Sequence, residues 1–210
     1  MVAAFLVLSP AIALQVDDFE SHGVTLTQER YQGREAIKVI EANSEKGATE
    51  TVAILKGKDF HNGTIEVWLA GAPSDEAAAA GGARGFVGIA FRVTDSSRYE
   101  AFYLRPTNGR AQDQLRRNHS IQYISHPEYP WERLRREAPG QYESYADMRP
   151  GEWIRFRIVV AGTAAELYLG TAEQPSLIVT DLKHGDLSGK VALWIGPGTA
   201  AHFSGLRITP

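Results

Sequence analysis

The chain has 210 residues, and its 22 Lys and Arg residues against 25 Asp and Glu residues give a net charge of -3. This length can bury a core without disulfide bonds, and the absence of cysteine excludes a disulfide scaffold, a thiolate zinc site and a cysteine nucleophile. The near-neutral charge argues against nucleic acid as the main partner, since phosphate binding usually needs a basic excess.

The first residues are apolar from Val2 to Leu14 apart from Ser9, and Ala11-Ile12-Ala13 has the small-x-small form of a signal cleavage site. Two interpretations stay open for residues 1–14: a signal peptide, or the first strand of the fold. The run is too short to span a bilayer, and no later segment resembles a membrane span. We expect a secreted or periplasmic protein whose residues 15–210 form a single domain.

Period-two alternation recurs along the chain, whereas helical periodicity is nearly absent. It predicts strands at Val24–Arg30, Ala36–Ile40, Thr51–Lys56, Gly63–Ala70, Gly85–Val93, Tyr99–Arg105, Asn118–Ile124, Trp153–Val160, Ala164–Leu169, Leu177–Thr180, Lys190–Ile195 and Ala201–Ile208. A dozen short strands separated by turn residues indicate an all-β protein, a sandwich of two antiparallel sheets of jelly-roll type.

Two stretches break this pattern and are predicted to be loops. Ala72–Ala83 is a small-residue segment, and Pro106–Gly151 holds one strand within long, polar, aromatic-rich connections. Loops this long in a compact domain are usually functional or disordered. The many aromatic residues of the second stretch favour function, and the site is predicted there.

Two neighbouring predicted strands carry small residues on one face. If they pair, they form a shallow trough with a floor of Gly88, Ala90 and Ala101 and a rim of Arg92, Tyr103 and Arg105. Such a trough suits a ligand, because missing side chains open space beside a charge. The alternative is that these residues thin the sheet so that another segment can pack on it.

Polar residues in and beside these strands are candidates for chemistry or for structure. Alternation puts Glu100 on the core face, where a carboxylate is either paired with an arginine or kept as an acid or base. His119 could transfer protons near neutral pH or serve as a hydrogen-bonded scaffold residue. Asn118 and Gln122 lie beside aromatic rings, a combination that suits the hydroxyl edges and apolar faces of sugars. Trp194 is a candidate stacking platform, and the arginines near Arg135 form either a solvated face or a site for an acidic sugar.

Several catalytic signatures are absent from the sequence, including a phosphate-binding glycine loop, a Gly-x-Ser-x-Gly elbow and a His-Glu-x-x-His metal motif. We therefore expect no cofactor and no catalytic metal. Structural calcium remains an alternative at the aspartates Asp17, Asp18, Asp181 and Asp186.

Three short motifs resemble the 3-keto-disaccharide hydrolase domain family, which are concanavalin A-like jelly rolls. They are Gly88-Ile89-Ala90-Phe91-Arg92 followed by Tyr99-Glu100, then Pro150-Gly151-Glu152-Trp153, and finally Val191-Ala192-Leu193-Trp194 with Phe203-Ser204-Gly205-Leu206-Arg207-Ile208. The resemblance spans about residues 50 to 210. It implies a concanavalin A-like jelly roll and cleavage of a glycoside oxidised at carbon 3, by proton abstraction, elimination and hydration.

That chemistry needs a base, an oxyanion donor and an acid within reach of one ring. The candidates are Glu100 or His119 as base, Arg92 as enolate stabiliser and Tyr103 as acid for the leaving group. The predicted sugar contacts are Arg105, Asn118, Gln122, Tyr123, Trp131, Tyr142, Glu143 and Trp194. Two alternatives remain open: a noncatalytic glycan-binding module, and a lyase acting on uronate polymers.

Overall fold

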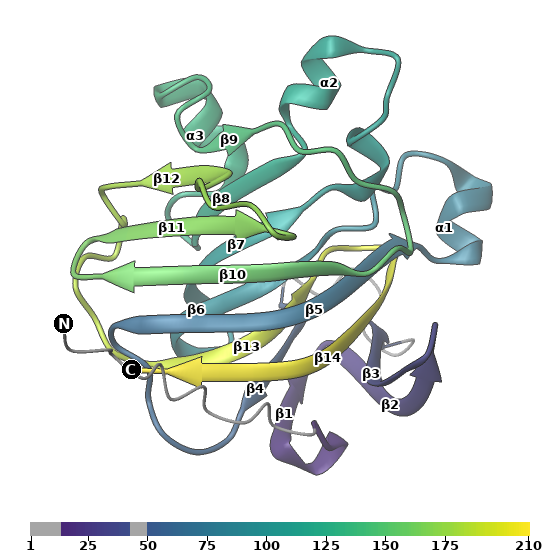
Figure 1. Cartoon of the computed structure of the whole chain (residues 1–210), viewed down its shortest axis with the longest axis horizontal. Coiled ribbons are helices and arrows are strands. Elements are labelled where there is room, and N and C mark those ends of the chain that lie inside the picture. The colour runs from purple at the N-terminus through teal and green to yellow at the C-terminus, as the bar shows by residue number, and fades with distance from the viewer. Residues whose placement is uncertain (1–13, 43–49) are drawn as a thin grey trace, which may run out of the picture.

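The structure is a computed structural model, and it describes residues 14–42 and 50–210 of the chain. The signal peptide or first strand predicted over residues 1–14 lies outside this part except for Leu14. Figure 1 shows strands stacked in two layers, with α2 and α3 at the top edge and α1 at the right. Both sheets are antiparallel and hold seven strands each, so the fold is the predicted β-sandwich.

The strand order separates the two sheets clearly. The first sheet runs β1 (Phe19–His22), β4 (Val52–Leu55), β13 (Lys190–Ile195), β6 (Val87–Asp95), β7 (Arg98–Leu104), β8 (Ile121–His126) and β9 (Glu143–Ser144). The second sheet runs β12 (Leu177–Val179), β11 (Ala164–Leu169), β10 (Ile154–Ala161), β5 (Gly63–Pro73), β14 (Thr199–Thr209), β3 (Arg34–Glu41) and β2 (Val24–Tyr31).

The core lies between the sheets and follows from the period-two pattern. Ile89 and Phe91 of β6 are fully buried, and so are Ile65, Val67 and Leu69 of β5. Alternate residues of a strand point to one face, so each strand places a row of apolar side chains inside. Burial of this apolar surface is the main force that holds the two sheets together.

The short helices are the main difference from the sequence-based expectation. The segments predicted as loops contain α1 (Asp75–Ala80), η3 (Pro106–Asn108), α2 (Gln114–Asn118) and α3 (Trp131–Glu137), and η1 (Val16–Asp18) precedes β1. The strand predicted to begin at Asn118 begins at Ile121, because Asn118 ends α2. Helices of one or two turns are too short to produce a recognisable hydrophobic period.

Arg92 forms hydrogen bonds with three loops at one end of the sandwich. The pairing of β6 with β7 shifts register after Phe91, and Arg92 adopts a left-handed backbone with φ of 52°. This bulge turns the guanidinium into the loop region, where it donates to the carbonyl oxygens of His61 (3.1 Å), Gly162 (2.8 Å) and Gly185 (2.7 Å). Bulges redirect side chains in this way. The side chain therefore satisfies carbonyl groups from three separate connections.

We expect Arg92→Ala to lower the free energy of unfolding by about 3 kcal/mol, because the carbonyl groups of three loops lose the buried guanidinium that binds them. Equilibrium denaturation in urea measures this change. The matched control is Arg30→Ala, since the side chain of Arg30 is 70% exposed and its loss should cost less than about 0.5 kcal/mol. Equal stability of the two variants would contradict the role given to Arg92.

Candidate functional site

One row of side chains crosses the outer face of the first sheet near the start of β6. The pairing of strands from β13 to β9 aligns Trp194, Gly88, Tyr103, Gln122 and Glu143. Residues directly opposite each other in antiparallel strands share a face, so Trp194 and Tyr103 lie on the same side of the sheet. A Cβ at Gly88 would lie 2.2 Å from the carbonyl oxygen of Phe102, so only glycine fits there.

The trough predicted on this face is filled by the protein's own rings. The Trp194 ring stacks on Tyr103 at 4.7 Å between centroids, and its Nε1 donates to the Tyr99 hydroxyl at 3.0 Å. Tyr99 and Tyr103 lie on either side of Ala101 along β7, and both Ala90 and Ala101 are fully buried. The expectation of an open trough is therefore wrong, because the small residues make room for these aromatic side chains.

Glu100 and Tyr123 lie on the inner face of the first sheet, away from that row. The Tyr123 hydroxyl donates to Glu100 Oε2 at 2.6 Å, and the backbone N–H of His184 donates to Glu100 Oε1 at 2.8 Å. Glu100 is fully buried, so it does not lie where a base on the outer face would act. Desolvation, followed by the Glu100 charge, raises the pKa of the Tyr123 hydroxyl far above its ordinary value, which keeps it a hydrogen-bond donor.

Two other predicted site residues, Arg92 and Tyr142, are also remote from the outer-face row. Arg92, expected at the rim of the trough, instead lies among the loops described above, because the bulge reverses its direction. Tyr142 is buried, its ring lies against Tyr123, and its hydroxyl donates to Asp181 Oδ2 at 2.7 Å. These side chains stabilise the fold and do not join a common site.

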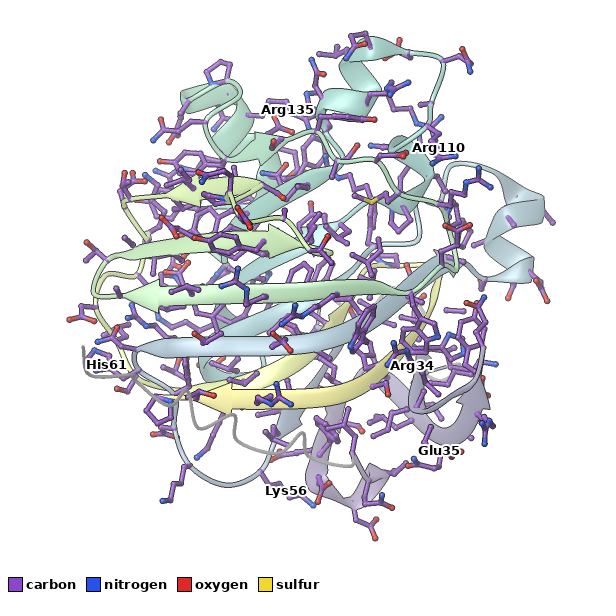
Figure 2. All side chains as sticks on the ribbon, viewed as in Figure 1. Arg34, Glu35, Lys56, His61, Arg110 and Arg135 are labelled. Carbon is purple, nitrogen blue, oxygen red and sulfur yellow. The ribbon has the colours of Figure 1, made fainter. Side chains whose placement is uncertain are left out.

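A cleft of about 540 Å³ opens at the end of the outer-face row, between α2, α3 and the loop before β6. We call it the arginine cleft, and its side chains include Arg84, Phe86, Arg105, Arg116, His119, Trp131 and Arg135. Figure 2 shows Arg135 between the two helices at the top edge of the molecule. A second cleft of about 520 Å³, near Lys56 and Lys190, has no Phe, Tyr or Trp in its lining. Of these two clefts, the arginine cleft is the one that combines aromatic rings with fixed donors, which is the usual make-up of a ligand site.

Arg105 forms the inner wall of the arginine cleft and is tied to the outer-face row. Its Nη2 donates to the Tyr103 hydroxyl at 2.8 Å and to Gln122 Oε1 at 3.2 Å, while Nη1 donates to the carbonyl oxygen of His119 at 3.3 Å. Its guanidinium carbon lies 5.4 Å from the centre of the Trp131 ring. These contacts fix the direction of the guanidinium, because a planar fork with several partners has one favourable orientation.

Glu143 lies beneath the arginine cleft with a side chain only 2% exposed. Arg135 holds it with two hydrogen bonds, from Nε to Oε1 at 2.8 Å and from Nη2 to Oε2 at 2.6 Å. Arg105 Nη1 and His119 Nε2 lie 3.8 Å and 3.7 Å from its carboxylate oxygens. A buried carboxylate is stable only with such partners, so Glu143 joins α3, β7 and α2 into one unit.

His119 is the residue that caps the C-terminus of α2, and it lines the arginine cleft. Burial is the largest of the causes that lower the pKa of His119 below its ordinary value of 6.5. The charge of Glu143 raises this pKa, whereas the charges of Arg135 and Arg105 lower it further. The imidazole is therefore neutral at pH 7 and can accept a proton. The helix itself is fixed by Asp113, whose carboxylate accepts a hydrogen bond from the backbone N–H of Arg116 at 2.6 Å.

The predicted site residues thus fall into three groups. Arg105, His119 and Trp131 line the arginine cleft, while Tyr103, Gln122 and Glu143 support it from below. Arg92, Glu100, Asn118, Tyr123, Tyr142 and Trp194 lie outside the cleft lining. Sequence reasoning missed Arg84 and Arg116, which come from a glycine-rich loop and a short helix. Charged residues in such segments look like ordinary surface residues until the fold brings them together.

Within residues 14–42 and 50–210, no group of three or more His, Asp or Glu side chains is arranged to hold a metal ion. The aspartates considered for calcium have separate partners, since Asp186 contacts Arg92 and Asp181 contacts Tyr142. No helix in the same residues is long and apolar enough to cross a membrane.

Comparison with known proteins shows likeness at the level of the fold. The sequence matches no family model and no curated protein sequence. A solved structure of the carbohydrate-binding module CBM66 from Bacillus subtilis is similar with a TM-score of 0.58 at 11% identity, and the match covers 90% of this chain and 97% of that one.

Two further structures have the same architecture. A provisionally assigned glycosyl hydrolase from Parabacteroides distasonis gives a TM-score of 0.54 at 11% identity, covering 96% of this chain and 98% of that one. A Bacillus subtilis protein of unknown function with a galectin-like fold also gives 0.54 at 11% identity, covering 92% and 89%. These likenesses support the jelly-roll fold, and the resemblance to the 3-keto-disaccharide hydrolase family stays a prediction.

We expect the pKa of His119 to lie below 6.5 in the folded protein. The unfolded chain then binds a proton first as the pH falls, so stability decreases from pH 6.5 down to the folded pKa. Two-dimensional NMR of the imidazole nitrogens measures the midpoint, with the signal assigned by its loss in His119→Gln. That variant should also lose this part of the pH dependence. A midpoint at or above 6.5 would contradict the burial described here.

Proposed function

We propose that the protein binds saccharides in the arginine cleft. The observation that carries the proposal is the combination of the Trp131 ring, which is 38% exposed, with the oriented guanidinium of Arg105. Sugars present apolar faces that stack on aromatic rings and hydroxyl groups that bind fixed donors. The solved structures of similar fold include a carbohydrate-binding module, a galectin-like protein and a glycosyl hydrolase assignment, which supports a carbohydrate ligand.

Binding without catalysis agrees best with the positions of the candidate catalytic groups. Glu100 accepts hydrogen bonds from Tyr123 and a backbone N–H inside the sandwich. Arg92 binds loop carbonyl groups at the end of the sandwich away from the arginine cleft. Tyr103 is buried and its hydroxyl accepts from Arg105. Base, oxyanion donor and acid must surround one reacting centre, and these residues do not.

A second candidate function is β-elimination from a 3-keto or uronate sugar. It is favoured by His119, a neutral imidazole that lines the arginine cleft 3.7 Å from Glu143. In this reaction a base removes the proton from the carbon next to the carbonyl or carboxylate group. The glycosidic carbon–oxygen bond breaks, the departing oxygen takes a proton, and an unsaturated sugar remains. For a 3-keto substrate, water then adds across the double bond. Arg105 would stabilise the enolate in place of Arg92.

The binding proposal predicts that Trp131→Ala weakens saccharide affinity about tenfold, or about 1.4 kcal/mol, because the exposed stacking surface is lost. Isothermal titration calorimetry with gluco-, galacto-, fructo- and galacturono-oligosaccharides measures this. The matched control is Tyr145→Ala, since Tyr145 is 41% exposed and lies outside the cleft lining. Undiminished affinity in Trp131→Ala would move the site elsewhere.

The β-elimination candidate predicts that the protein forms product from 3-keto glycosides or uronate oligomers. Mass spectrometry and ultraviolet absorbance detect the product. Turnover should fall at least about a hundredfold in His119→Gln, the range expected when a general base is removed. The variant should keep its binding affinity within about threefold. Saturable binding with no product on any of these substrates would leave recognition as the function.

A further inference from the structure

The charges around the arginine cleft do not balance. Four guanidinium groups line it, from Arg84, Arg105, Arg116 and Arg135, against a single carboxylate in the lining, Asp113. Glu143 lies beneath the cleft and is engaged by Arg135 and Arg105. The whole chain nevertheless carries a net charge of -3, so this concentration of positive charge is local.

Among the described residues, the remaining two arginines have no acidic partner. Arg116 donates from Nε to Asn108 Oδ1 at 2.8 Å and from Nη2 to the Thr107 hydroxyl at 3.1 Å, and both acceptors are neutral. Within residues 14–42 and 50–210, the guanidinium of Arg84 has neither a hydrogen bond nor an ion pair. Asp113 is committed to the start of α2 through the backbone N–H of Arg116.

These two guanidinium groups line the same cleft, and their like charges repel each other. The pKa of Arg84 is lowered, first by burial and then by the charges of Arg116 and Arg105. Like charges gathered in a partly desolvated cleft destabilise the unliganded protein, and an anion between them removes that cost. Arginine is well suited to this task, because its planar fork can hold a carboxylate or sulfate with two hydrogen bonds.

We propose that the ligand of the arginine cleft is an acidic saccharide whose anionic group binds between Arg84 and Arg116. This inference rests on the proposed saccharide-binding function and adds the class of sugar. The anionic group is a uronate carboxylate or a sulfate ester, which present the same negatively charged oxygens. Trp131 and Arg105 then bind the uncharged part of the sugar chain.

A matched pair of ligands tests the charge requirement directly. Galacturonate oligomers and their carboxyl-reduced galactose counterparts differ only at carbon 6, and sulfated galactan oligomers with their desulfated, neutral counterparts supply the sulfate comparison. Calorimetry at low ionic strength should give at least about tenfold tighter binding of the charged member of one pair. Its affinity should fall as salt is added, while that of the neutral member should not. The preferred pair identifies the carboxylate or the sulfate.

Variants assign the effect to the two arginines. Arg84→Gln combined with Arg116→Gln should abolish the preference for the charged ligand, so that the two members of the pair bind with affinities within about twofold of each other. The matched control is Arg136→Gln, since Arg136 lies on α3 with a side chain 69% exposed and outside the cleft lining. Circular dichroism and urea denaturation confirm that each variant is folded.

The outcomes separate the two proposals. Equal or tighter binding of the neutral member in both pairs overturns the inference and leaves the saccharide-binding function intact. An undiminished preference in the double variant overturns the assignment to Arg84 and Arg116. Failure of the unmodified protein to bind any of the saccharides overturns the proposed function, and the inference falls with it.

Discussion

The carboxylate of Glu143 is almost completely buried, and a buried charge is tolerated only where opposite charges and donors surround it. Arg135 supplies a two-point contact from α3, Arg105 approaches from the end of β7, and His119 approaches from the end of α2. The same arginines then form walls of the cleft. One electrostatic requirement therefore sets the positions of two helices relative to the sheet, and it gives the cleft its shape before any ligand is present.

The polar residues fall into two sets, one that stabilises the inside of the sandwich and one that lines the cleft. Inside the sandwich, Glu100 and Tyr123 satisfy each other and a backbone N–H, and so strengthen the contact between β7, β8 and the loop after β12. On the outer face, the Trp194 ring covers alanines that could otherwise have formed a floor for a ligand. The cleft is lined by guanidinium donors and by the rings of Phe86, His119 and Trp131. Such a set recognises a ligand more readily than it transforms one, because most of its members do not exchange protons near neutral pH.

Alternation in the sequence was sufficient to predict the two-sheet sandwich and the burial of Glu100 on its inner face. It failed at Arg92, because a bulge changes the direction of the next side chain without leaving a trace in the pattern. Alternation also did not show whether the trough is open or filled, since small residues make room for a ligand or for a neighbouring ring equally well. Arg84 and Arg116 could not be found from the sequence, because their proximity arises from the way a glycine-rich loop and a two-turn segment fold against the end of β7.

The two ends of the sandwich differ in how much sequence change they can absorb. At the end held by Arg92, one buried guanidinium donates to carbonyl groups of three loops, so an insertion in any of them would remove an acceptor from this buried charge. At the opposite end, α1 is an addition to the connection between β5 and β6, and none of its residues is buried. In evolution, the first end should therefore keep its loop lengths while the second diversifies. New ligand preferences can then arise from the helical connections without loss of the underlying sandwich.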